Sequence, residues 1–120
     1  MKQMRATVID LTPLTLYCGL IFWLSSLSGI SNPCLFPHQD KLIHITLYAA
    51  MGVLAWRFFR HLISQKRVLI LVTIAFCSLY GITDEFHQSL VPGRSPDMLD
   101  WLADTLGATI AIFLITKDEH

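Results

Sequence analysis

One stretch of the chain concentrates side chains that can move protons, bind cations or hold anions. It reads Tyr80-Gly-Ile-Thr-Asp-Glu-Phe-His-Gln-Ser-Leu-Val-Pro-Gly-Arg94, and Asp97, Asp100 and Asp104 follow it. Carboxylates beside an imidazole can perform general acid–base catalysis or bind a divalent cation, and an arginine can hold a carboxylate or a phosphate. The segments that flank this stretch are strongly apolar. Ionisable groups so close to a membrane core mark a candidate functional site.

The elements that must position these residues are predicted to be transmembrane helices. Hydrophobic residues make up 53% of the 120 residues and charged residues 15%, which is too apolar for an ordinary soluble domain of this size. Four apolar stretches are each about 20 residues long, the length at which a helix crosses the hydrocarbon core. They run from Val8 to Ser28, Lys41 to Phe59, Val68 to Gln88 and Met98 to Thr116. We therefore expect an all-α integral membrane bundle of four transmembrane helices, forming one domain over residues 1–120.

Two further expectations concern the ends of these spans. The first span has no strong cleavage site after it, so it is expected to be an uncleaved anchor rather than a signal peptide. Trp23, Trp56 and Trp101 lie near the predicted span ends and are expected to anchor the protein at the membrane interface.

The distribution of basic residues predicts how the bundle is oriented. Cytoplasmic loops of membrane proteins hold an excess of lysine and arginine. Seven of the nine basic residues fall on one predicted side: Lys2, Arg5, Arg57, Arg60, Lys66, Arg67 and Lys117. Both termini are therefore predicted to be cytoplasmic (N-in and C-in), with the Gly29 to Asp40 and Ser89 to Asp97 loops outside. The zero net charge gives no reason to expect a nucleic-acid partner.

This topology brings the polar ends of three helices into one outer layer. The polar residues of each end recur at a spacing of three, four or seven, which places them on one helix face. They are Lys41, His44 and Tyr48 on the second span, Tyr80, Asp84, His87 and Gln88 on the third, and Asp97, Asp100 and Asp104 on the fourth. Gly107, Ala108 and Ala111 continue the acidic face inward, and small residues let helices approach closely. That face is therefore predicted to point into the bundle.

The residues of the second and third spans are expected to perform different chemistry. His87 lies one turn from Asp84, and a carboxylate in that position can orient an imidazole and raise its basicity, as a general base requires. His44 is equally consistent with an interfacial hydrogen-bonding residue and with a base or ligand. Glu85 lies about 100° around the helix from Asp84, so it faces either water or a neighbouring helix.

The acidic residues of the fourth span are expected to have two roles. Asp97 is predicted to cap the start of a helix, because its side chain can accept hydrogen bonds from the first backbone N–H groups. Asp100 and Asp104 lie one and two turns deeper, where a carboxylate requires a basic or metal partner. Arg94 stands in a predicted tight turn, from which it can pair with an acid or hold a lipid phosphate.

Several of these residues form an ordered set of motifs. The set is Asp40-Lys41-x-x-His44 before an apolar helix with Tyr48, then Asp84-Glu85-x-His87-Gln88, then Pro92-Gly93-Arg94, and then the Asp100 to Gly107 segment. From Asp40 onward, this order resembles the pattern of the VanZ-like family. The resemblance implies a multi-pass protein of the bacterial inner (cytoplasmic) membrane that acts in the cell envelope. The family takes its name from a member linked to low-level teicoplanin resistance, which implies an influence on antibiotic resistance. Asp104 departs from the asparagine expected in the family's Asp-x-x-x-Asn-x-x-Gly pattern.

Three functional hypotheses remain open. In the first, the outer polar cluster recognises an anionic lipid or glycolipid headgroup. The candidate binding residues are Lys41, Tyr48, Glu85, Gln88, Arg94, Asp100 and Asp104. In the second, the protein is a hydrolase or transferase for a lipid-linked envelope precursor, with His87, Asp84 and His44 catalytic and the aspartates holding Mg²⁺ or Mn²⁺. In the third, buried ion pairs only fix the packing of the bundle, or of a homo-oligomer of bundles.

Overall fold

The described residues of the protein form a bundle of four long helices. The structure, a computed structural model, describes residues 1–26, 39–92 and 97–117, with the backbone alone at residues 39 and 40. The helices are α1 (Lys2–Ser26), α2 (Gln39–Phe59), α3 (Lys66–Ser89) and α4 (Met98–Thr116), and these ranges include no strand. Each helix is long and apolar enough to cross a membrane. The prediction of an all-α bundle with four membrane-spanning helices is confirmed.

The predicted spans and the observed helices differ mainly at the start of α1. This helix begins at Lys2, whereas the span was predicted from Val8. Hydropathy marks the part of a helix that crosses hydrocarbon, while backbone hydrogen bonding continues through good helix formers such as Lys2 and Arg5. Residues 27 and 28, the predicted end of this span, lie outside the described residues. The bounds of α2, α3 and α4 agree with the prediction to within two residues.

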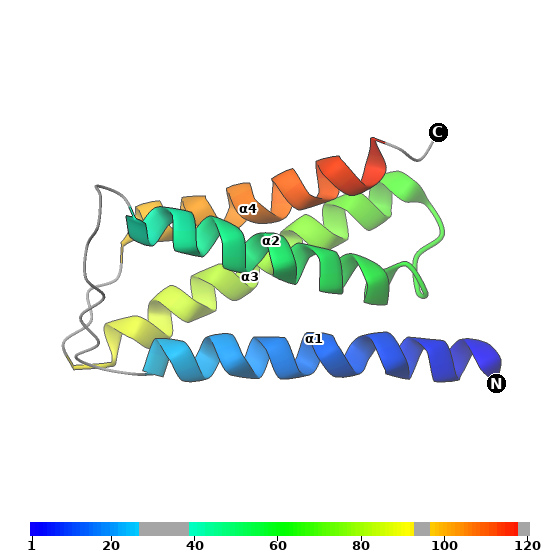
Figure 1. Cartoon of the computed structure of the whole chain (residues 1–120), viewed down its shortest axis with the longest axis horizontal. Helices are drawn as coiled ribbons and strands as arrows, with labels where there is room; N and C mark the ends of the chain where they lie inside the picture. The colour runs from blue at the N-terminus through cyan, green and yellow to red at the C-terminus, as the bar shows by residue number, and fades with distance from the viewer. Residues whose placement is uncertain (27–38, 93–96, 118–120) are drawn as a thin grey trace.

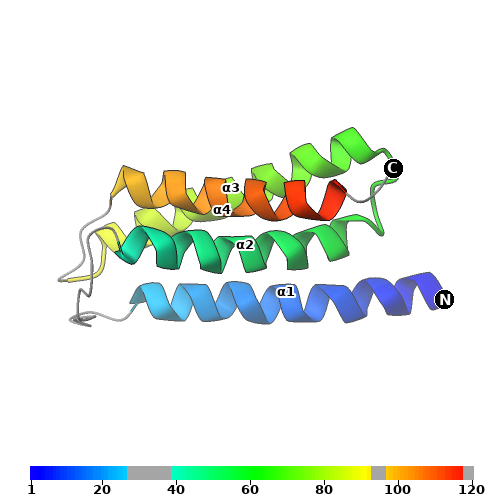
Figure 2. The ribbon, with the colours of Figure 1, turned by 45° about the horizontal axis from the view of Figure 1, so that its top comes forward.

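Consecutive helices run antiparallel, so α1 and α3 end where α2 and α4 begin (Figure 1). We call this end of the bundle the site end, and the opposite end, where α1 begins and α4 ends, the terminal end. Helices α2 and α3 lie between α1 and α4 (Figure 1), and in the turned view α2 lies between α1 and the overlapping α3 and α4 (Figure 2). Within the described ranges, α1 and α4 make no close approach to each other. The longest dimension is 46 Å, which compares with about 40–45 Å for a bilayer with its headgroups.

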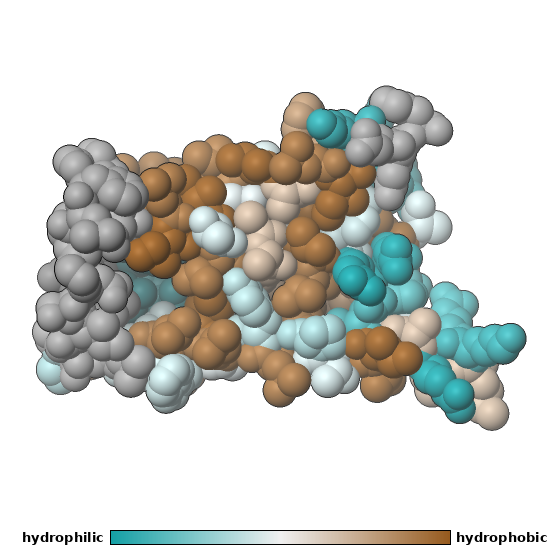
Figure 3. All heavy atoms as spheres, viewed as in Figure 1, coloured by the Kyte–Doolittle hydropathy of each residue, from teal (hydrophilic) through white to brown (hydrophobic). Residues whose placement is uncertain are grey.

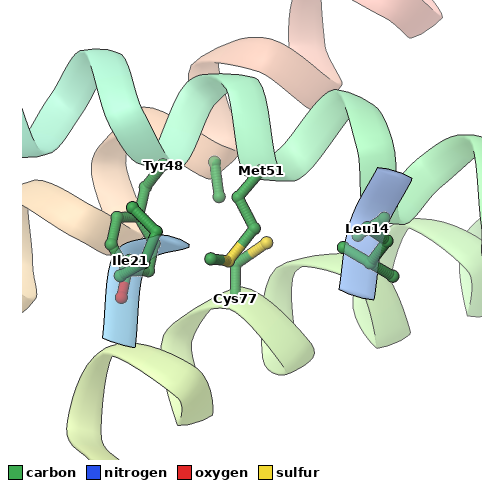
Figure 4. Packing of buried hydrophobic residues seen from close by; sticks show 7 residues of the cluster. Leu14, Ile21, Tyr48, Met51 and Cys77 are labelled. Carbon is green, nitrogen blue, oxygen red and sulfur yellow. The ribbon is translucent and has the colours of Figure 1, made fainter. Parts of the chain in front are cut away.

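Apolar side chains fill the middle of the bundle and also cover its outside. Figure 4 shows Met51 of α2 pointing toward Cys77 of α3, and Tyr48, Leu14 and Ile21 belong to the same buried cluster. On the visible face, hydrophobic residues form a broad band across the bundle (Figure 3). An apolar interior with an apolar exterior is the arrangement that a lipid-embedded bundle requires.

The tryptophans are not all at the surface. Trp56 is only 4% exposed and packs with Leu69 and Ile112 in a second buried cluster. Its expected role as an interface anchor is therefore wrong, because the end of α2 is covered by α3 and α4.

Small residues set the contact between α2 and α4, the most extensive helix pair in the bundle. A Cβ atom at Gly107 would overlap the backbone carbonyl of Ile45, and one at Gly52 would lie 3.3 Å from the Ala108 backbone. The absence of side chains at both glycines lets the two backbones approach closely, as in other membrane helix pairs. This close contact fixes the height at which the polar residues of α2 and α4 meet.

Candidate functional site

Lys41 joins the start of α2 to the start of α4 at the site end. Its ammonium donates hydrogen bonds to Asp97 Oδ2 at 2.8 Å and to Asp100 Oδ1 at 2.7 Å. The Lys41 and Asp100 side chains are only 18% and 11% exposed. Water screens charges poorly in such a place, so the attraction between them is stronger than at an open surface. Lys41 is thus the basic partner that a carboxylate at the depth of Asp100 requires.

His44 lies one turn deeper on α2, between two carboxylates. Its Nδ1 is 2.7 Å from Asp104 Oδ1, and its Nε2 is 3.7 Å from Asp100 Oδ2. An ionised carboxylate only accepts hydrogen bonds, so Nδ1 carries the proton toward Asp104 and Nε2 is the nitrogen that can take up a second proton. Both carboxylates would stabilise the resulting imidazolium. His44 therefore serves as the basic partner of Asp104.

Two buried polar atoms at or next to the His44–Asp104 pair have no hydrogen-bond partner among the described residues. They are Asp104 Oδ2 and the Tyr48 hydroxyl, on side chains of residues that are 0% and 1% exposed. Helix α3 makes room for the carboxylate at Gly81, where a Cβ atom would lie 3.0 Å from Asp104 Oδ2. An unpaired buried polar group costs about 1–3 kcal/mol. Such atoms are where a proton, a water or a polar ligand group is most strongly favoured.

Helix α1 contributes two serines that the sequence analysis did not identify. Ser25 donates a hydrogen bond to Asp84 Oδ1, and Ser26 Oγ lies 2.8 Å from His87 Nε2. Ser26 also donates to the Phe22 carbonyl oxygen at 2.9 Å. A hydroxyl has one proton, so both Ser26 bonds form together only when His87 Nε2 is the donor. The Phe22 and His87 rings stack with 4.1 Å between their centroids, which holds the imidazole against α1.

A groove opens between α3 and α4 at the site end. It has a volume of about 370 Å³ and is lined by Ile82, Glu85, Asp97, Met98 and Trp101. Glu85 Oε2 accepts the backbone N–H of Asp97 at 2.7 Å, so this carboxylate faces the neighbouring helix. The indole N–H of Trp101 donates to the Ser78 carbonyl oxygen at 3.0 Å, which fixes the ring. The groove thus has apolar walls, with the carboxylates of Glu85 and Asp97 at its edge.

The structure describes some of the remaining predicted residues and not others. Asp97 caps α4 as predicted, since its side chain accepts the Leu99 N–H at 2.9 Å. Gln88 is 3% exposed and lies at the end of α3. Arg94 and the side chain of Asp40 lie outside the described residues. Among the residues that the structure does describe, no group of three or more His, Cys, Asp or Glu side chains is arranged to hold a metal ion.

Comparison with known proteins identifies the family to which this arrangement belongs. Residues 1–116 match the family model described as VanZ/LLP1. The chain belongs to the VanZ-like family. The match includes α1, which precedes the motifs that carry the resemblance and supplies Ser25 and Ser26 to the site. Neither a search of the curated proteins nor one of the solved structures gives a match.

Acidification is expected to weaken the Lys41–Asp97 corner of this VanZ-like protein. The bonded Lys41 ammonium, helped by the Leu99 N–H, holds the pKa of Asp97 below its ordinary value near 3.8. A carboxyl with a lowered folded pKa contributes stability that is complete above the ordinary value and is lost as the pH falls through the lowered one. Asp97→Asn keeps a capping side chain but has no charge to lose. We expect its thermal stability in detergent to fall less than that of the wild type below about pH 4; parallel pH profiles would contradict this.

Proposed function

We propose that this VanZ-like protein acts in the bacterial cell envelope by recognising the headgroup of a membrane lipid or lipid-linked precursor at its site end. We also propose that this recognition alters susceptibility to glycopeptides such as teicoplanin. In this proposal the site end faces outward in the inner membrane. The charge distribution supports that orientation, because Lys41 is the only lysine or arginine among the described residues that lies at the site end, and cytoplasmic ends are the basic ones.

The groove beside the charged residues is the observation that carries the proposal. Its apolar side, formed by Ile82, Met98 and Trp101, suits the first segment of a lipid chain, while Glu85 and Asp97 lie where a headgroup would begin. Sites for small amphipathic molecules commonly combine apolar walls with a few fixed polar groups. Ile82 and Met98 are 48% and 74% exposed, so the groove can be entered sideways from the bilayer.

The partners of the charged residues narrow the class of headgroup. Lys41 already binds two carboxylates, so a phosphate would have to displace Asp97 or Asp100 from it. Glu85, which lines the groove, has in Oε1 an acceptor without a hydrogen-bond partner in the described part of the chain. Acceptors favour ligands that supply donors. Of the two classes considered from the sequence, the glycolipid with its sugar hydroxyls fits better than the anionic headgroup.

Blocking the groove should remove bound lipid without unfolding the protein. We expect Ile82→Trp to fill the groove and to lower the amount of co-purifying lipid by at least about tenfold, equivalent to about 1.4 kcal/mol of binding free energy. Leu79→Trp is the matched control, because Leu79 lies one turn earlier on α3, is 61% exposed and does not line the groove. Native mass spectrometry of detergent-purified protein measures the retained lipid and also reports any homo-oligomer.

A second variant tests the carboxylate of the groove separately from its apolar walls. Glu85→Gln keeps an oxygen that can accept the Asp97 N–H but removes the charge. We expect it to lose the same lipid while keeping its thermal stability, and cells that express it to lose any wild-type effect on teicoplanin susceptibility. Wild-type protein that carries no lipid, or equal lipid on Ile82→Trp and Leu79→Trp, would contradict the proposal.

A further inference from the structure

The terminal end of the bundle is strongly basic. Seven exposed lysines and arginines lie there: Lys2, Arg5, Arg57, Arg60, Lys66, Arg67 and Lys117. On the face shown in Figure 3, the most hydrophilic side chains gather at this end, which is the end that carries the N-terminus in Figure 1. Within the described ranges, Asp10 is the only acidic residue in this half of the bundle. Among the described residues, every lysine and arginine except Lys41 therefore lies at the terminal end.

Asp10 organises the basic residues nearest to it. It is 7% exposed and lies inside α1, a position where an unpaired carboxylate would be costly. Its Oδ2 is 2.6 Å from His61 Nε2, and its Oδ1 is 3.6 Å from Arg57 Nε. Arg60 lies one turn beyond Arg57, since its N–H bonds to the Trp56 carbonyl oxygen at 3.0 Å, and it adds to the attraction on Asp10.

The charges of this corner do not cancel. Arg57 and Arg60 carry two positive charges against the one negative charge of Asp10, which leaves one positive charge when His61 is neutral. Arg57 is 57% exposed and engages Asp10 through Nε, and its two terminal nitrogens have no hydrogen-bond partner among the described residues. A guanidinium fork matches the oxygens of a phosphate, so two of them one turn apart can hold one phosphate between them.

We propose that Arg57 and Arg60 bind the phosphate of an anionic phospholipid in the leaflet at the terminal end, with Asp10 positioning Arg57. The surroundings favour a lipid over a soluble phosphate. Ile9 and Leu62, the neighbours of Asp10 and His61, are 62% and 61% exposed and offer apolar contacts to an acyl chain. The site is independent of the proposed function, because it lies at the opposite end of the bundle and involves none of the same residues.

The test compares three arginine variants of the full chain. Delipidated protein in detergent is titrated with phosphatidylglycerol, phosphatidylcholine or inorganic phosphate, and native mass spectrometry counts the bound molecules. A basic residue near an anionic lipid surface contributes about fivefold in affinity. We expect Arg57→Gln and Arg60→Gln each to weaken phosphatidylglycerol binding by about that factor, and the double variant by about 25-fold. Arg67→Gln, an exposed arginine at the same end but on α3, should leave binding unchanged.

Each outcome of this experiment decides the proposal. Arg60 has no hydrogen bond or ion pair from its side chain to any described residue, so Arg60→Gln tests the site even if Arg57→Gln disturbs Asp10 and the fold. Equal losses in Arg67→Gln and Arg60→Gln would show a diffuse field instead of a site and would overturn the proposal. Phosphatidylcholine that binds as tightly as phosphatidylglycerol would also overturn it. If inorganic phosphate binds as tightly as phosphatidylglycerol, the ligand of the site is a soluble anion and the proposal of a lipid is overturned.

Discussion

Lys41→Met is expected to destabilise the folded bundle by about 3–5 kcal/mol, because it removes the cation that holds two carboxylates at the site end. Most of the cost comes from leaving the Asp100 carboxylate without a cation, since its side chain is only 11% exposed and its Oδ1 lies 2.7 Å from the Lys41 ammonium. Methionine keeps much of the length of lysine and helix propensity, so the loss reflects the missing charge. Thermal unfolding in detergent, followed by circular dichroism, measures it.

A double variant tests whether the loss comes from the carboxylate left behind. Asp100→Asn keeps the shape of the side chain but removes its charge, so Lys41→Met/Asp100→Asn should recover much of the stability that Lys41→Met loses. In a double-mutant cycle, coupling of at least about 1 kcal/mol would assign the effect to this pair. If the two single effects simply add, the Lys41–Asp100 contact does not contribute to folding and the cluster is held together in another way.

The positions of the helices could be predicted because each depends on a property that is local in the sequence. A span of about 20 apolar residues identifies itself by its length. The inward direction of the α4 face was also readable, because Asp100 and Asp104 share their face with Gly107 and Ala108, and all four are buried. An acidic stripe that continues into small residues has no reason to face lipid.

The partner of each polar residue could not be predicted in the same way. That Lys41 binds Asp100 and His44 binds Asp104 depends on the rotation and relative height of α2 and α4, which the Gly107–Ile45 contact sets. Periodicity gives the face of a helix but not its height against a neighbour. The sequence therefore predicted that polar residues of α2, α3 and α4 share one end of the bundle, without predicting the pairs that they form.

The contribution of α1 was missed for a different reason. Serines near the end of an apolar helix commonly bond to their own helix backbone, as Ser26 does to Phe22, so they carry no specific signal. Asp10 did carry a specific signal in the sequence, because it is a lone acid inside an apolar span and such residues are rarely without function. Its partner His61 lies in the connection between α2 and α3, and no motif linked the two positions.

Gly107→Ala is expected to lower the stability of the bundle by at least about 1–3 kcal/mol, although it adds a single methyl group and a better helix former. The added Cβ atom would overlap the Ile45 carbonyl, and a backbone carbonyl cannot move aside as a flexible side chain can. Helices α2 and α4 would have to separate or slide. Because the same contact sets the height of Lys41 and His44 against Asp100 and Asp104, the variant should also lose lipid at the site end.

Gly19→Ala provides the matched control for this effect. Gly19 lies inside α1, and a Cβ atom there would meet nothing within 4 Å. The alanine should therefore be neutral, or stabilising by up to about 1 kcal/mol through helix propensity. Thermal unfolding of both variants in the same detergent separates the two cases. If Gly107→Ala unfolds at the temperature of Gly19→Ala, the α2–α4 backbone contact is looser than the structure gives, and the pairing of Lys41 and His44 with the α4 aspartates does not depend on it.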